Sequence, residues 1–119
     1  MKENLRSIGT TYEQLGADYL ENEGYKFVSR NLFTPFGEVD LILEKDDRLF
    51  FVEVKFRSNQ NYGSARESIT TLKLKRLKKS VAYLMKGKFS EYTSFSISFL
   101  GIEMQDEALQ FDFIDNIFS

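Results

Sequence analysis

Two strand-like segments separated by a short polar stretch constrain this fold more than any other feature of the sequence. Residues 38–44 alternate between polar and apolar side chains, and residues 49–57 are rich in Phe and Val. Residues 45–48, between them, are all polar and of a kind that favours a turn. This pattern predicts two strands that pair as an antiparallel hairpin.

The register of the hairpin follows if its loop is centred between residues 46 and 47. Paired residue numbers then sum to 93, as 46 and 47 themselves do. Asp40 would lie opposite Glu53, with their Cβ atoms ~5 Å apart. The same register sets two further pairs opposite each other: Glu38 with Lys55, and Ile42 with Phe51.

Strand alternation also assigns side chains to faces. On the second strand, one face is wholly apolar and must pack on the core: Phe50, Val52, Val54 and Phe56. Its other face carries Leu49, Phe51, Glu53, Lys55 and Arg57. On the first strand we expect a shared face of Glu38, Asp40, Ile42 and Glu44. The carboxylates should therefore point the same way from neighbouring strands.

Carboxylates that face each other across strands destabilise a sheet, and partial burial raises that cost. A divalent cation would offset the repulsion between Asp40 and Glu53. Two carboxylates, a main-chain carbonyl, which we assign to Val54, and waters suit Mg²⁺ or Mn²⁺. A solvated polar face with a Glu38–Lys55 surface ion pair, worth about 0 to 1 kcal/mol, would need no metal. The pattern alone leaves both interpretations open.

The sequence contains no Cys and no His, and this narrows the chemistry. Disulfides, thiolate metal sites and cysteine nucleophiles are excluded. A Ser-His-Asp triad, an imidazole base and the usual zinc ligands are excluded as well. Any catalysis must therefore use carboxylates, lysines and backbone oxygens.

The other expected elements surround the hairpin. Thr10 and Glu13 have the spacing of a capping box, which predicts a helix from about Thr11 to Glu23 that ends at Gly24. Ser64 and Glu67 repeat that spacing ahead of an apolar stripe, which predicts a second helix ending near Gly87. Further strands are expected at residues 25–31, 93–100 and 109–114. The order αβββαββ predicts an α/β fold, a mixed five-stranded sheet flanked by helices.

The length and composition suit one domain over residues 1–119. No stretch approaches the ~20 apolar residues of a membrane helix, and the N-terminus lacks the apolar run of a signal peptide. We therefore expect a cytoplasmic protein that has no membrane partner.

Around this hairpin the sequence resembles the PD-(D/E)xK nuclease superfamily, which has a restriction-endonuclease-like fold. It resembles more closely the YraN-like family of bacterial, Holliday-junction-resolvase-like proteins. The resemblance covers nearly the whole chain, and its central block is Gly37–Ile42 with Phe51–Arg57. The chain departs from the pattern at Ser94–Ser96, where relatives commonly have Arg-Phe-Asp, and at Thr71, where Pro is common.

The resemblance implies a Mg²⁺- or Mn²⁺-dependent endonuclease acting on DNA. Asp40 and Glu53 would hold the metal, Lys55 would assist the attacking water, and Glu13 would complete the acidic cluster. Glu13 also has a purely structural reading, as the capping-box partner of Thr10. Paired cuts on a branched, junction-like substrate would suit a homodimer, an association borrowed from resolvases.

The second predicted helix is strongly basic. Residues 64–88 contain eight basic residues, Arg66, Lys73, Lys75, Arg76, Lys78, Lys79, Lys86 and Lys88, and one acid, Glu67. Lys73 and Arg76 flank its apolar stripe, and Arg57 ends the second hairpin strand. We expect these three to contact DNA phosphates, or else to be solvated. Residues 103–115 hold five acids and no base, so the net charge of -2 is unevenly distributed.

Three interpretations of function remain at this point. The first is a metal-dependent DNA endonuclease, and the second is a nucleic-acid-binding module of the same fold that does not cut. The third is an interaction scaffold, in which the aromatic segment 111–114 serves association.

Overall fold

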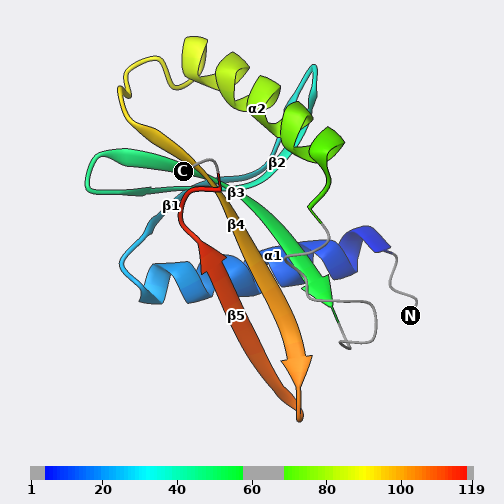
Figure 1. The fold of residues 1–119 in the computed structure, drawn as a ribbon. Coiled ribbons are helices and arrows are strands. Elements are labelled where there is room, and N and C mark those ends of the chain that lie inside the picture. Colours follow the sequence, from blue (N-terminus) through cyan, green and yellow to red (C-terminus); the bar gives the residue numbers. More distant parts are fainter. Residues whose placement is uncertain (1–4, 58–68, 118–119) are drawn as a thin grey trace.

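Five strands form one sheet in the order of the sequence, and a helix covers each face (Figure 1). The computed structural model describes residues 5–57 and 69–117, with side chains from residue 11 onwards. The elements are α1 (Leu5–Asn22), β1 (Lys26–Thr34), β2 (Gly37–Lys45), β3 (Arg48–Arg57), α2 (Thr71–Lys86), β4 (Phe95–Gln105) and β5 (Ala108–Ile114). This arrangement confirms the predicted mixed α/β fold.

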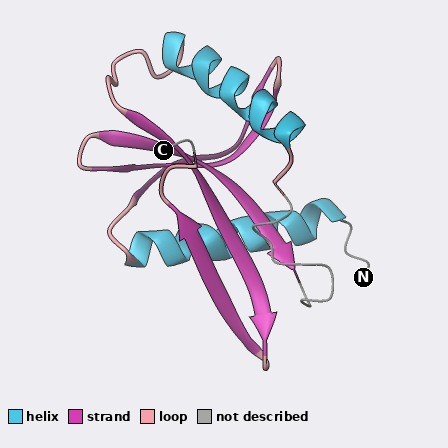
Figure 2. Cartoon of the chain, in the orientation of Figure 1, coloured by secondary structure: helices cyan, strands magenta, loops and turns pink. Residues whose placement is uncertain are grey.

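The sheet is mixed because β3 and β4 run parallel, whereas the other neighbours are antiparallel. Parallel neighbours cannot be joined by a tight turn, so the chain must cross over between them. The crossover includes α2, which returns the chain along one face of the sheet (Figure 2). In the described ranges, no helix is long and apolar enough to cross a membrane.

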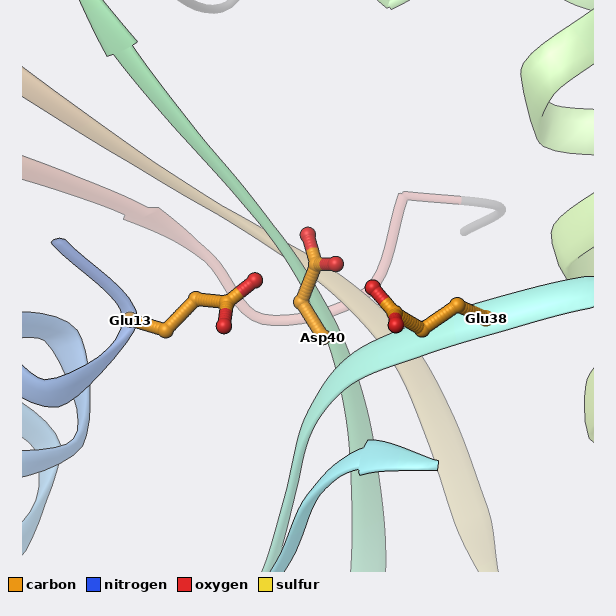
Figure 3. A group of neighbouring side chains, drawn as sticks. All are labelled: Glu13, Glu38 and Asp40. Atoms are coloured by element: carbon orange, nitrogen blue, oxygen red, sulfur yellow. The ribbon is translucent and has the colours of Figure 1, made fainter. Parts of the chain in front are cut away.

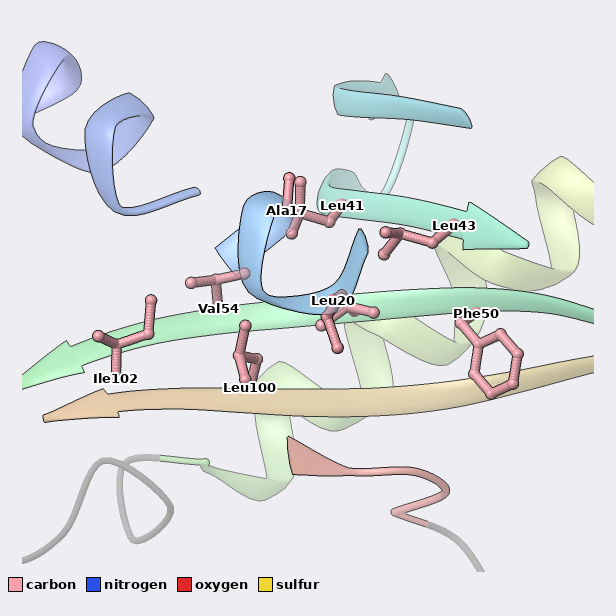
Figure 4. Packing of buried hydrophobic residues seen from close by; sticks show 9 residues of the cluster. Ala17, Leu20, Leu41, Leu43, Phe50, Val54, Leu100 and Ile102 are labelled. Carbon is pink, nitrogen blue, oxygen red and sulfur yellow. The ribbon is translucent and has the colours of Figure 1, made fainter. Parts of the chain in front are cut away.

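Each helix closes a separate core. Under α1, Ala17 and Leu20 pack on apolar residues of β2, β3 and β4 (Figure 4). A Cβ atom at Gly16 would lie 2.8 Å from Leu100 Cδ2, so glycine lets α1 approach the sheet closely. Under α2, the second core contains nine buried residues: Val39, Ile42, Leu49, Phe51, Leu77, Val81, Leu84, Phe89 and Ile97.

Strand β3 therefore has two buried faces. The predicted apolar face packs toward α1, where the Phe56 ring stacks on Tyr12 with centroids 3.8 Å apart. On the opposite face, Leu49 and Phe51 are fully buried beneath α2. Only the far end of that second face, from Glu53 onward, carries charge.

The predicted register of the hairpin is confirmed over its turn half. Leu41 pairs with Val52, Ile42 with Phe51 and Lys45 with Arg48. Asp46 and Asp47 have φ values of 54° and 64°, as a two-residue type I′ turn requires. The pairing ends at Leu41 and Val52, one position short of Asp40 and Glu53.

The expectation that Glu38, Asp40 and Ile42 share a face is wrong. Val39 packs in the same core as Ile42, whereas Leu41 packs in the other. Strict alternation is therefore broken at Asp40. On β1, the residue next to Asp40 is Asn31, which lies between the pairs Arg30–Leu41 and Leu32–Val39 and has a φ of 52°.

Neither helix begins at the residue that its capping box predicted. α1 starts at Leu5, so Thr10 lies inside it and is not its N-cap. The N-cap of α2 is Thr70, whose hydroxyl accepts a hydrogen bond from the Lys73 amide at 3.1 Å. Thr71 is its first residue, a position that also suits proline. The capping box at residues 64–67 lies outside the described residues.

The predicted end of α1 is confirmed. Gly24 has a φ of 98°, and its amide donates to Glu21 at 3.1 Å. The Tyr25 amide donates to the Leu20 carbonyl at 3.0 Å, which completes a Schellman motif. Gly24 thus turns the chain from α1 into β1.

Candidate active site

Asp40 lies where β2 and β3 stop pairing, and its carboxylate replaces a backbone carbonyl as a hydrogen-bond acceptor for β3. Its Oδ2 accepts a hydrogen bond from the Val54 amide at 2.9 Å. Burial, followed by the charge of Glu53, raises the pKa of Asp40 to about 8, although the Val54 bond opposes the rise. The carboxyl group is therefore uncharged over much of the neutral range.

Two other carboxylates flank Asp40 (Figure 3). One carboxylate oxygen each of Glu13, Glu38 and Asp40 lie within 4.8 Å of one another. Glu13 comes from α1 and Glu38 from β2, so residues distant in sequence meet here. The predicted acidic cluster around Asp40 and Glu13 therefore exists, and Glu38 belongs to it.

Asn31 fixes Glu13 in this cluster. Its Nδ2 donates to Glu13 Oε1 at 2.7 Å and lies 3.4 Å from Glu38 Oε1. Burial raises the pKa of Glu13, the Asn31 bond opposes this, and the charge of Glu38 adds to it. Because Thr10 is helical, the capping role considered for Glu13 does not apply.

Glu53 is buried and turns toward α2. Its Oε2 lies 2.7 Å from the ammonium of Lys73, and only 8% of the residue is exposed. Glu53 is outside the group of three carboxylates, but its charge and a side-chain hydrogen bond both raise the pKa of Asp40. The structure thus brings the two predicted carboxylates together, although regular strand pairing stops before them.

Lys55 lies next to Lys73. Its pKa is lowered, first by the hydrogen bond with Lys73, then by burial and by the charge of Lys73. For Lys73 burial acts in the same direction, but the hydrogen bonds with Glu53 and Lys55 outweigh it and raise the pKa. Lys55 is thus the lysine that loses its proton more readily.

The predicted Glu38–Lys55 ion pair does not form in the described part of the chain. Glu38 pairs with Phe33 of β1, beyond the point where β2 leaves β3. Its carboxylate faces Asn31 and Asp40 instead. The break in alternation at Asp40 separates the two residues.

The residues predicted to contact nucleic acid occupy different places. Lys73 lies inside the site, against Glu53. Arg76 is exposed and lines a pocket of about 240 Å³ together with Glu38, Glu53 and Lys73. Arg57 is half-buried at the end of β3, and Arg66 lies outside the described residues.

The expected basic face of α2 is confirmed. Four lysines are exposed on it, namely Lys75, Lys78, Lys79 and Lys86. Its buried residues are Leu77, Ser80, Val81 and Leu84. At the chain's other end, Phe111 stacks on Tyr19 with centroids 4.3 Å apart, so this ring packs within the chain.

The carboxylates fit a hard divalent cation. Mg²⁺ binds oxygen ligands at about 2.0 to 2.1 Å in octahedral geometry, so opposite ligands lie about 4 Å apart and adjacent ligands about 3 Å apart. The oxygens of Glu13, Glu38 and Asp40 lie within 4.8 Å of one another, which is wider than these spacings. The side chains would have to rotate inward to hold the ion, and the bound cation would offset the negative charges that, after burial, raise the Asp40 pKa.

Sequence reasoning missed Asn31, and it predicted a DNA contact for Lys73 where the structure shows an ion pair with Glu53. Asn31 orients Glu13 from a left-handed position in β1, and Lys73 neutralises Glu53 from α2. The basic residues of α2 predicted a positive charge near the site, but they did not predict that Lys73 pairs with Glu53. No sequence signal pointed to the left-handed conformation of Asn31.

Comparison with known proteins places the chain in a family. The model of the uncharacterised protein family UPF0102 matches residues 12–115. A UPF0102 protein of Syntrophomonas wolfei is 37% identical over 113 residues, covering 95% of this chain and 98% of the relative. One from Aliivibrio fischeri is 39% identical over 110 residues, covering 91% and 89%. This chain belongs to the uncharacterised protein family UPF0102.

Proposed function

We propose that this chain is a metal-dependent endonuclease that hydrolyses phosphodiester bonds in DNA, with branched, junction-like DNA as its substrate. One observation carries the proposal: a half-buried Asp40 lies between other carboxylates, and two lysines lie next to Glu53. This set of groups matches the PD-(D/E)xK pattern in the sequence. It contains the carboxylates for a cation and the ammonium groups for a phosphate.

Asp40 is the central metal ligand in this proposal, because it contacts both groups of carboxylates. Its partners are Glu13 and Glu38 on one side, or Glu53 and the Val54 carbonyl on the other. A bound Mg²⁺ or Mn²⁺ would polarise the phosphate and lower the pKa of a water. The Val54 amide keeps the Asp40 carboxylate oriented in either case.

Lys55 is the residue that assists the attacking water in this proposal. Its lowered pKa makes the neutral amine easier to form, and that amine would accept a proton as the water oxygen attacks phosphorus and the phosphorus–oxygen bond to the leaving group breaks. Lys73 keeps its charge and, on release from Glu53, can offset the charge that develops on the phosphate. The two lysines therefore divide proton transfer and charge stabilisation between them.

The basic face of α2 supplies the contacts to the DNA backbone. Arg76 lies on the pocket that contains Glu53, and the exposed lysines extend along the same helix. Contacts to phosphates do not distinguish one base from another. Because they are electrostatic, the affinity for DNA should fall steeply as the salt concentration rises.

The test is incubation of the purified protein with branched, single-stranded and linear DNA in Mg²⁺, Mn²⁺ or EDTA. We expect metal-dependent cutting, with branched DNA cut fastest. If DNA binds but neither metal yields products, the chain is a non-cutting binding module. The basic face of α2 is the observation that favours this second candidate. Failure to bind DNA at any salt concentration would leave the scaffold interpretation.

A further inference from the structure

Large aromatic side chains are exposed around the turn that joins β1 and β2. Phe33 is 68% exposed, Phe36 is 43% exposed, and Tyr83 of α2 is 50% exposed. Phe33 is the most exposed of the large hydrophobic residues in the described ranges. A cluster of such residues in water typically marks a surface that binds something.

This aromatic turn lies beside the candidate active site. Phe33 is the cross-strand partner of Glu38, so the two side chains share a face of the hairpin. Phe36 lines the pocket that also contains Glu38, Glu53 and Arg76. A ligand in this pocket would therefore contact Phe36, and Phe33 is the neighbour of Glu38 across the strand pair.

The turn lies against α2 (Figure 1), and a hydrogen bond between Thr34 and Ser80 joins the two. The Thr34 hydroxyl donates to the Gly37 carbonyl at 2.9 Å and accepts from the Phe36 amide at 3.1 Å. The Thr34 hydroxyl has one proton, which goes to Gly37. The Ser80 hydroxyl of α2 must therefore be the donor in the 2.8 Å hydrogen bond between Ser80 and Thr34. The Phe36 ring also meets Tyr83 edge to face, with centroids 6.3 Å apart. The Phe36 and Tyr83 rings are thus preorganised.

The surrounding charge selects the kind of ligand. α2 contains six basic residues and no acidic one. The Lys79 ammonium lies 5.9 Å from the centre of the Phe36 ring, and Arg76 is exposed nearby. Flat apolar rings interleaved with cations suit a ligand that alternates flat bases with phosphates. Unpaired nucleotides have this chemistry, whereas a paired duplex keeps its bases stacked on one another.

We propose that Phe33, Phe36 and Tyr83 form a stacking platform for unpaired bases that flank the phosphate to be cut. The substrate class is then DNA with unpaired or splayed bases at the cleavage position. This inference rests on the proposed function, because it deepens the substrate preference of the same site. Stacking on an aromatic side chain makes affinity depend on base exposure and little on base identity.

The experiment measures binding with the Asp40→Asn protein, so that cutting does not interfere. The probes are two DNA duplexes of equal length, one fully paired and one with a central unpaired bubble that contains 2-aminopurine. We expect tighter binding to the bubble, with quenching of the 2-aminopurine fluorescence as its base stacks. Phe33→Ala should weaken bubble binding by about 5- to 100-fold, and Phe33→Trp should retain it.

Phe27→Ala is the matched control, since Phe27 is 40% exposed at the other end of β1 and should not affect binding. Equal affinity for both DNAs, or unchanged bubble binding by Phe33→Ala, would overturn the proposal. The patch would then fit a protein partner. A wild-type protein that stacks bases but cuts nothing would refute only the nuclease. One that cuts with no such stacking would refute only the platform.

Discussion

Replacing Asp40 with asparagine should change how stability depends on pH. The amide keeps nearly the same shape, and its oxygen can still accept the Val54 amide proton. It cannot ionise, however, so it avoids placing a negative charge beside Glu53 and Glu13. At low pH, where Asp40 is protonated, the two proteins should be almost equally stable.

The size of the effect follows from the pKa of Asp40, which is about 8 in the folded chain and 3.8 for an ordinary aspartate. The folded pKa is the higher one, so the stabilising contribution is complete below about pH 4. It is lost as pH rises through about 8. At about 1.4 kcal/mol per pH unit, the loss has an upper limit of about 6 kcal/mol, of which about 5 is reached at pH 8.

Urea unfolding followed by circular dichroism measures this directly, at several values from about pH 4 to 8 in EDTA. The free energy of unfolding of the wild type should fall over this range. That of Asp40→Asn should fall less and exceed the wild type by about 2 to 5 kcal/mol near pH 8. Asp47→Asn, at an exposed turn position of the same hairpin, should follow the wild type. Parallel curves for all three proteins would refute the reasoning.

The remaining predictions concern stability and metal binding. Lys73→Met should cost about 1 to 3 kcal/mol in urea unfolding, because buried Glu53 loses its partner, and adding Glu53→Gln should recover part of it. Thr70→Ala should cost about 1 kcal/mol by the same assay, as the N-cap of α2 is lost. Leu84→Ala should cost about 2 to 5 kcal/mol, whereas exposed Leu72→Ala should cost little. Excess Mn²⁺ at neutral pH should raise the melting temperature of the wild type but not of Asp40→Asn; equal shifts would contradict Asp40 as ligand.

The hairpin could be predicted in detail because local rules determine it. A two-residue turn fixes the register, so the pairs from Leu41 to Lys45 followed from residue numbers alone. The end of α1 was equally local, because Gly24 supplies the left-handed conformation that a Schellman motif needs. These features depend on residues that are close in sequence.

Helix starts and strand lengths were harder, because tertiary packing decides them. A capping-box spacing at Thr10 did not stop α1, which continues back to Leu5. β4 extends to Gln105, well past the expected end at residue 100, since its polar residues pair with β5 in an exposed hairpin. Ser96, at a position where the resemblance implied an acid, accepts a hydrogen bond from Arg48 at 2.8 Å.

The site was predictable only in part for the same reason. The register brought Asp40 near Glu53, and the raised Asp40 pKa reflects first its burial and then the charge of Glu53. The Lys73 contact depends on how α2 packs over β3, which no sequence spacing encodes. The Asn31 contact depends on an irregular position in an edge strand.

The most direct test of the central claim is the rate of Mn²⁺-dependent DNA cleavage by matched variants. Wild type and Asp47→Asn should cut a branched substrate at similar rates, because Asp47 is exposed and remote in the hairpin. Asp40→Asn should be slower by at least about a hundredfold, and EDTA should abolish cutting by all three. Equal rates for Asp40→Asn and Asp47→Asn would contradict a metal-dependent nuclease centred on Asp40.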